Sequence, residues 1–240
     1  MKTEKQEQVL QFGERQILYY LYRTNRKRVR IVVSPELTVD VFAPKAVDDE
    51  QVRMTVQKKA LWITWALDRM KSFHPLPAPK QYISGEPLLY LGRQYQLKVE
   101  ETVAKPAKLL GPFLWVRVSD RSDTRSIKRA VDRWYRKRAF ETFGRYLQKC
   151  YAMVVRYDIP EPTMAVRVMR RRWGSCTDSG RITLNVNLVQ VPRHCIEYVI
   201  LHELCHLKHL NHSRSFYEFL SCCMPDWRSR KEMLDRFLLE

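Results

Sequence analysis

Long hydrophobic runs are missing from this sequence. No stretch of its 240 residues approaches the roughly 18 consecutive apolar residues that are typical of a transmembrane helix. Residues 1–11 are charged and polar, and the apolar core of a secretory signal does not follow them. We therefore expect no membrane span, and the cytoplasm is the default location.

Several further signals are missing. The six cysteines are scattered and form no CxxC pair. In a chain with 45% hydrophobic residues they are expected to be reduced thiols around an apolar core, not a disulfide framework. No internal repeat, low-complexity segment or P-loop is apparent. No pattern indicates the oligomeric state.

Acidic residues are scarce relative to basic ones. Lys and Arg outnumber Asp and Glu by 43 to 26, which gives a formal net charge of +17. This excess favours anionic partners such as nucleic acid, although no recognised nucleic-acid motif accompanies it and a solvated basic surface would have the same composition. One basic region is residues 23–30. The other is a helical segment that contains Arg125, Lys128, Arg129, Arg133, Arg136, Lys137 and Arg138.

The periodicity of apolar residues predicts an α+β fold. The first half is β-rich with one helix at 47–71, and its strands are expected at 19–33, 37–42, 88–90, 94–99 and 113–118. The second half is expected to have a hairpin of 164–169 with 181–187 and helices at 123–151, 192–209, 213–224 and 226–238. We therefore expect a β-rich N-terminal region, 1–122, and a C-terminal core, 123–240, in which a helix packs on a mixed or antiparallel sheet.

The chemistry is concentrated in residues 202–206, which form an HExxH motif. His202 and His206 lie about 40° apart around a helix and one turn apart along it, so both imidazoles can reach one metal ion. Glu203 stands beside them, close enough to take a proton from a water molecule on that metal. The motif predicts a zinc site with Glu203 as the catalytic base.

A catalytic zinc ion needs a third protein ligand. His209 shares a helical face with His202 but would lie about 10 Å further along a straight helix. His212 requires the helix to end and the chain to fold back, which the intervening Asn211 permits. Glu218 would serve in a site with two histidines and one glutamate. His212 is favoured, and the other two candidates stay open.

Four segments with this order and spacing resemble the YgjP-like metallopeptidases, a family related to the WLM and SprT-like zinc proteases. They are RWGSC at 172–176, RITLN at 181–185, HELCH at 202–206 and NHS at 211–213 followed by Phe216. The resemblance extends more weakly to SGE at 84–86 and YLGR at 90–93. One departure is Tyr217, where related sequences often have Trp.

The resemblance implies a zincin-like metallopeptidase core with a β-rich N-terminal extension. It maps Zn²⁺ ligands to His202, His206 and His212, with Glu203 as acid and base, and it implies a protein or peptide substrate. A cation should stabilise the oxyanion during peptide hydrolysis. The candidates are Arg170, Arg171, Arg172 and His209.

The segment before the second strand of the expected hairpin is a candidate for substrate binding. Arg172, Trp173, Gly174 and Ser175 could line the cleft and pair with an extended peptide. The alternative is that Trp173 fills the core and Gly174 forms a bulge. We expect Cys176 to be a buried thiol; the alternative is a thiol close to the metal. We expect Met224 to be a core residue; the alternative is an apolar contact beneath the metal.

Two other functions compete with a zinc metallopeptidase. The arginines between 167 and 172 could instead favour hydrolysis of a nucleotide phosphoanhydride, or the basic surface could make the chain a nucleic-acid-associated protease. A non-catalytic nucleic-acid-binding protein is disfavoured, because such a protein would have no function for Glu203 between the two histidines.

Overall fold

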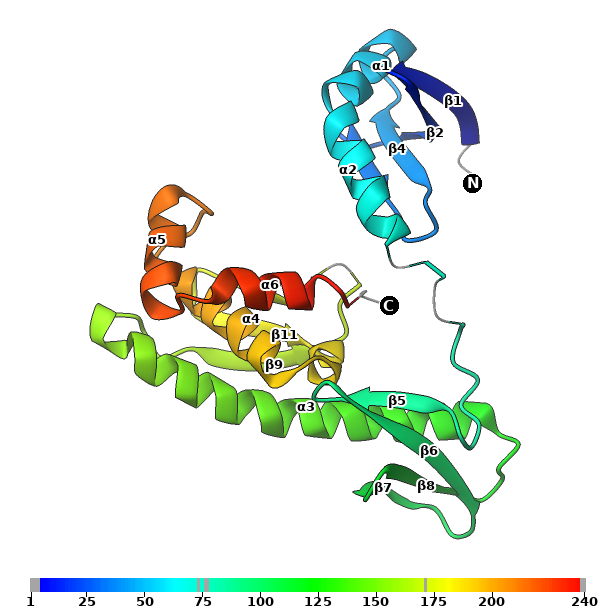
Figure 1. Ribbon diagram of the computed structural model, residues 1–240, viewed down its shortest axis with the longest axis vertical. Coiled ribbons are helices and arrows are strands. Elements are labelled where there is room, and N and C mark those ends of the chain that lie inside the picture. Colours follow the sequence, from blue (N-terminus) through cyan, green and yellow to red (C-terminus); the bar gives the residue numbers. More distant parts are fainter. Residues whose placement is uncertain (1–4, 73, 76–77, 171, 238–240) are drawn as a thin grey trace. The chain divides into compact units, whose positions relative to one another are not determined.

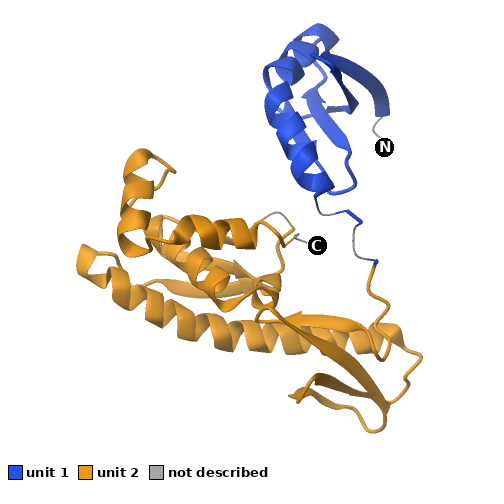
Figure 2. Ribbon diagram, in the orientation of Figure 1, with its two compact units in different colours: residues 1–78 blue, residues 79–240 orange. Residues whose placement is uncertain are grey.

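The computed structural model describes residues 5–72, 74–75, 78–170 and 172–237. It is an α+β fold with a β-rich N-terminal part, as the sequence predicts (Figure 1). The chain forms two compact units, residues 1–78 and 79–240, which are described separately (Figure 2). No helix within the described ranges is both long and apolar enough to cross a membrane.

The first unit is a four-stranded sheet with two helices. Its strands are β1 (Lys5–Phe12), β2 (Arg15–Thr24), β3 (Arg30–Val33) and β4 (Val39–Pro44), and its helices are α1 (Asp49–Lys58) and α2 (Ala60–Lys71). The strand order is β1-β2-β4-β3, with β2 and β4 parallel at the centre. Alternate side chains of the central strands are buried against Val52 and Val56, as expected when helices cover one face of a sheet.

The second unit contains two sheets. The first sheet comprises β5 (Pro87–Tyr90), β6 (Arg93–Glu101), β7 (Lys105–Leu110) and β8 (Phe113–Val118), and the long helix α3 (Thr124–Val154) follows it. The second comprises β9 (Thr163–Arg167), β10 (Gly174–Cys176) and β11 (Arg181–Asn185) in the order β10-β11-β9. After the 3₁₀ turn η2 (Val186–Gln190) come the helices α4 (Arg193–Cys205), α5 (Arg214–Cys223) and α6 (Trp227–Leu234).

The two four-stranded sheets repeat one arrangement. Each has two hairpins, and the last strand of the second hairpin lies parallel to the inner strand of the first. The order β5-β6-β8-β7 thus matches β1-β2-β4-β3. When the first hairpins are aligned by their turns, the buried residues Leu10 and Tyr19 correspond to Leu88 and Leu97. The parallel registers β2–β4 and β6–β8 then pair three further buried residues: Val39 with Leu114, Val41 with Val116, and Ala43 with Val118.

The helices that follow the two sheets also correspond. Asp48 accepts a hydrogen bond from the backbone at the start of α1, and Asp123 does so at the start of α3. Each aspartate lies five residues after a residue of the aligned pair Ala43 and Val118. The expectation that the chain has no internal repeat is therefore wrong for the structure. The repeat is not visible in the sequence, because the corresponding core positions need only be apolar and need not be identical.

Helix α3 explains why the compact units do not divide at 122/123, the boundary expected from the sequence. It packs against both sheets of the second unit and against α4 (Figure 1). Leu88, Leu97 and Leu114 of the preceding sheet share one core with Ile127 and Val131 of α3. Residues 79–122 therefore belong to the same compact unit as the HExxH helix.

Several expected elements are corrected by the structure. The helix expected at 47–71 is two helices that meet at Lys59, and the strand expected at 19–33 is the two strands β2 and β3. The expected hairpin is wrong as well: β9 pairs parallel with β11, and the hairpin partner of β11 is β10. Alternation of apolar residues locates a strand, but its partner depends on contacts distant in sequence.

A close backbone contact fixes the start of α4. The amides of Leu91 and Gly92, in the turn between β5 and β6, donate to the carbonyls of Val189 and Gln190 at 2.9 and 3.0 Å. Gly92 has φ +78°, and a Cβ there would lie 2.8 Å from Cγ of Pro192. Glycine satisfies both the positive φ and the short distance. The first sheet is thereby attached to the helix that carries the HExxH motif.

Candidate metal centre

Helix α4 contains the HExxH residues and is anchored in a fully packed core. Ile196, Ile200 and Leu204 are completely buried on one face, which fixes the rotation of the helix. The helix ends at Cys205, and the chain then folds back. His206 Nδ1 donates to the carbonyl of His209 at 3.1 Å, so the return of the chain also orients the His206 ring.

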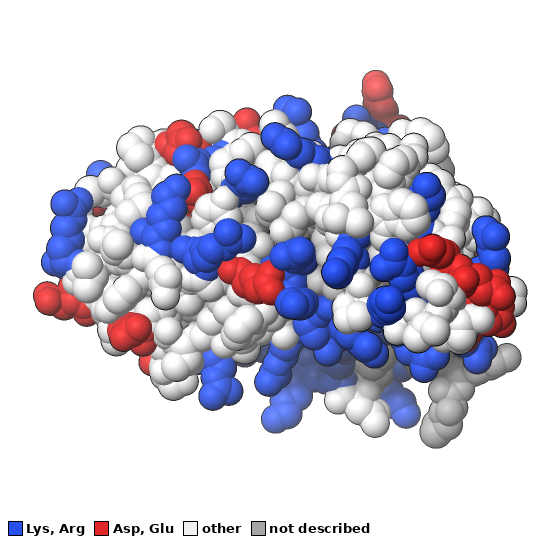
Figure 3. Space-filling model, turned by 90° about the horizontal axis from the view of Figure 1, so that it is seen from below, with Lys and Arg blue, Asp and Glu red and all other residues white. Residues whose placement is uncertain are grey.

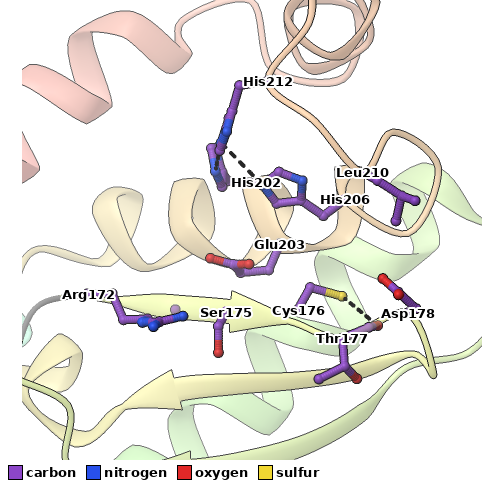
Figure 4. Close-up of a pocket in the computed structure, with 11 residues that line it drawn as sticks. Arg172, Ser175, Cys176, Thr177, Asp178, His202, Glu203, His206, Leu210 and His212 are labelled. Atoms are coloured by element: carbon purple, nitrogen blue, oxygen red, sulfur yellow. Dashed lines mark hydrogen bonds between the residues drawn. The ribbon is translucent and has the colours of Figure 1, made fainter. Parts of the chain in front are cut away.

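Three imidazoles converge on one point (Figure 4). His212 Nε2 lies 3.0 Å from His202 Nε2 and 3.2 Å from His206 Nε2, and ligand atoms of all three rings lie within 4.8 Å of one another. Two ligands on a tetrahedral zinc ion, each bonded at ~2.0–2.1 Å, are separated by about 3.3–3.4 Å. The histidine triad, as we call His202, His206 and His212, therefore fits such an ion.

Burial keeps two rings of the triad, His202 and His206, in the neutral form. Burial, and then the charges of His206 and His212, lower the pKa of His202 to about 3, and burial also lowers the pKa of His206. Neutral imidazole is the form that binds a metal. Phe216 packs beneath all three rings, at centroid distances of 5.0, 4.6 and 4.9 Å.

Glu203 lies beside the triad in a pocket with a volume of about 460 Å³ (Figure 4). Its side chain is 6% exposed, and burial raises its pKa to about 7, against the opposing charge of Arg172. A carboxyl group with a pKa near neutrality can both accept and return a proton. The pocket is lined by Arg172, Gly174, Ser175, Cys176, Thr177, Asp178, His202, Glu203, His206, Leu210 and His212.

Gly174 makes room for the carboxylate. A Cβ at this position would lie 2.6 Å from Glu203 Oε1, 2.9 Å from Cγ and 3.0 Å from Cδ. We predict that Gly174→Ala displaces the carboxylate and lowers kcat/KM for peptide hydrolysis by about 100-fold, because displacing a catalytic group by about 1 Å can lower the rate by that factor. Metal content should not change. Steady-state kinetics and metal analysis test this.

A matched control for that variant lies in α3. A Cβ on Gly144 would meet only Met164 Cε at 3.9 Å, so Gly144→Ala adds the same methyl group without displacing a neighbour. Its kcat/KM should equal that of the parent. Equal activity of the two variants would show that the Glu203 side chain does not need the space at Gly174.

The structure separates the candidates for the third ligand. The side chain of His209 packs on Phe219 at a centroid distance of 5.5 Å, and Glu218 forms an ion pair with Arg214 at 2.7 Å. Neither belongs to the cluster of possible metal ligands found among the described residues. Of the three candidates, His212 is the one that approaches His202 and His206.

The arginine candidates differ in position. Arg172 lines the pocket, whereas Arg170 does not, and Arg171 lies outside the described residues. In the described part of residues 167–172, Arg172 is thus the single arginine at the pocket. This weakens the basis for a phosphoanhydride substrate, which rested on several arginines around the metal.

The other residues singled out in the sequence are divided between pocket and core. Gly174 and Ser175 line the pocket, while Trp173 packs against the hydrophobic core and is not a lining residue. Cys176 lines the pocket, and burial and then Glu203 raise its pKa to about 11. It does not belong to the cluster of possible metal ligands among the described residues. Met224 is a buried core residue.

Two supporting residues were not predicted. The sequence indicates Phe216 only as part of a motif, whereas in the structure it packs against the whole triad. Asn185 is fully buried, and its Nδ2 donates to the carbonyls of Met169 at 2.6 Å and Arg172 at 3.0 Å, while the carbonyl of Trp173 accepts from the Asn185 amide at 2.8 Å. Asn185 therefore holds the segment that leads into β10. The only signal was its polar side chain at the end of an apolar strand.

A histidine triad that could hold a metal ion, beside a buried carboxylate, is the arrangement expected of the class of metallohydrolases. The chain belongs to the YgjP-like family: the model of its metallopeptidase domain matches residues 27–237. The expected family is confirmed, and the chain is a metallopeptidase by family.

Comparisons with individual proteins add little to this assignment. One similar solved structure is the crystal structure of the metallopeptidase zymogen of Pyrococcus abyssi abylysin. It is 24% identical, with a TM-score of 0.35, and the match covers 39% of this chain and 90% of that chain. No curated protein matches the sequence significantly.

Proposed function

We propose that this protein is a zinc-dependent peptidase in which His202, His206 and His212 hold the metal and Glu203 is the general base. The convergence of three imidazoles beside a buried carboxylate carries the proposal. A zinc ion bound there would act as a Lewis acid on a water molecule and on the substrate carbonyl.

The chain's own residues would then move the proton. The Glu203 carboxylate accepts a proton from the attacking water and returns it to the leaving amine, for which a pKa of about 7 is well placed. Arg172, exposed at the same pocket, is placed to stabilise negative charge on the carbonyl oxygen.

Strand β10 offers a place for the substrate backbone. It is the edge strand of its sheet, paired with β11 on one side only. An extended peptide can add to such an edge through main-chain hydrogen bonds. Gly174 and Ser175 on β10, with Arg172 before it, would then contact the peptide beside Glu203.

Removal and return of the metal test the proposal. The purified full chain should contain about one zinc ion and hydrolyse unfolded protein substrates. Exhaustive chelation should abolish hydrolysis, and added Zn²⁺ should restore it, because the Lewis acid is then absent or present. A panel of nucleoside triphosphates serves as control and should not be hydrolysed. Full peptidase activity in a protein shown by elemental analysis to be metal-free would overturn the proposal.

A further inference from the structure

A row of arginines lies on one face of α3. Arg125, Arg129, Arg133 and Arg136 are all exposed, and their spacing places them within about 80° around the helix. Within the described ranges, none of these four side chains forms an ion pair with a carboxylate. We call these four residues the arginine stripe.

The acidic residues of α3 pair elsewhere. Asp132 pairs with Lys128 at 2.6 Å, and Glu141 pairs with Lys137 and Arg138 at 3.9 and 3.1 Å. An ordinary solvated helix face alternates acids and bases one turn apart, whereas like charges at that spacing destabilise a helix. The stripe therefore opposes the stability of α3 unless an anion lies against it.

A cavity of about 290 Å³ adjoins the stripe where α3 meets β7 and β8. Four cations from three elements line it, namely Lys105, Arg117, Arg129 and Arg133, and no acidic residue among those described does so. Among the described residues, Arg117 is the one of these four that has an ion pair, through Nε to Glu100 at 2.7 Å. Figure 3, which looks onto the α3 side of the second unit, shows Lys and Arg outnumbering Asp and Glu there.

The internal repeat offers a comparison for the stripe. When Asp48 and Asp123 are aligned, the four positions of the stripe correspond in α1 and α2 to Glu50, Met54, Lys58 and Leu61. The same arrangement of sheet and helix thus forms in the first unit without a row of arginines. The row is a property of the second copy, which points to a role in binding.

We infer that the arginine stripe and the adjoining cavity bind the phosphate backbone of nucleic acid without regard to base sequence. The guanidinium group of arginine can donate two parallel hydrogen bonds to phosphate oxygens. A row of such groups is complementary to a polymer whose phosphates repeat at regular intervals. The remaining lining residues are Ala104, Pro106, Val118, Ser119, Ser126 and Ala130, which offer no aromatic surface to recognise bases. This cavity shares no lining residue with the metal pocket, so the inference is independent of the proposed peptidase.

Charge reversal on the stripe tests the inference. Fluorescence anisotropy would measure binding of labelled duplex DNA and RNA to the full chain and to Arg129→Glu with Arg133→Glu, between 50 and 200 mM salt. At 100 mM salt each phosphate contact contributes roughly eightfold through counterion release, so losing two contacts should weaken binding at least about 50-fold. The salt dependence of log Kd should fall by about two.

The matched control places the same charge change outside the stripe. Lys58→Glu with Lys59→Glu alters exposed residues at the end of α1 in the first unit and should leave Kd almost unchanged. Thermal unfolding of both variants checks that they are folded. Equal weakening by the two variants, or no binding by the parent at 50 mM salt, would overturn the inference. So would binding of phosphatidylserine vesicles in place of nucleic acid.

Discussion

Glu203→Gln should leave the zinc content of the protein unchanged and lower kcat/KM for peptide hydrolysis by about 10²–10⁴-fold, the usual contribution of a general base. Gln has nearly the same shape, so it fits the space beside Gly174 that the carboxylate occupies. It cannot accept a proton, and Glu203 does not belong to the histidine cluster that would hold the metal. Elemental analysis and steady-state kinetics on one preparation measure both properties.

The same substitution elsewhere on α4 gives the control. Glu197 does not line the pocket; it pairs with Lys149 at 2.6 Å and with Arg230 at 2.8 Å. Glu197→Gln should lose some stability through these ion pairs but keep its kcat/KM. A Glu203→Gln protein that hydrolyses peptides within a few-fold of the parent would show that another group accepts the proton.

The core of the candidate site could be predicted because its information is local. HExxH fixes the relation of His202, Glu203 and His206 within a single helical turn. The position of His212 depends on where α4 ends and how the next residues fold back, and the hydrogen bond from His206 Nδ1 to the His209 carbonyl becomes visible only in three dimensions. Spacing favoured His212 but could not separate it from Glu218.

Long-range features were harder to predict. β10 has three residues, too few to show alternation, yet it forms the edge of the pocket and provides Gly174. The glycine was noted as a possible site of close approach, but its neighbour, the Glu203 carboxylate, is distant in sequence. The pairing of β9 with β11 and the repeat of the two four-stranded sheets likewise depend on contacts between remote residues.

His212→Ala should lower zinc affinity by more than ~100-fold and abolish peptide hydrolysis. Removing a residue that only hydrogen-bonds to a metal ligand typically lowers metal affinity by ~10–100-fold, so removing a ligand itself should lower it more. His212 is exposed, so its removal leaves no buried cavity, and the unfolding temperature of the metal-free protein should not change. Competition with a chromogenic chelator gives the zinc affinity.

His209→Ala provides the matched control, since it removes an imidazole from the same returning segment. The His209 side chain packs on Phe219, while the backbone carbonyl that orients His206 is retained in the variant. Zinc affinity and activity should therefore stay close to those of the parent. If His209→Ala loses zinc and His212→Ala keeps it, the third ligand is His209, and the return of the chain in solution differs from that described here. If both variants keep zinc, the metal is held without either side chain, and Glu218→Ala becomes the variant that should lose it.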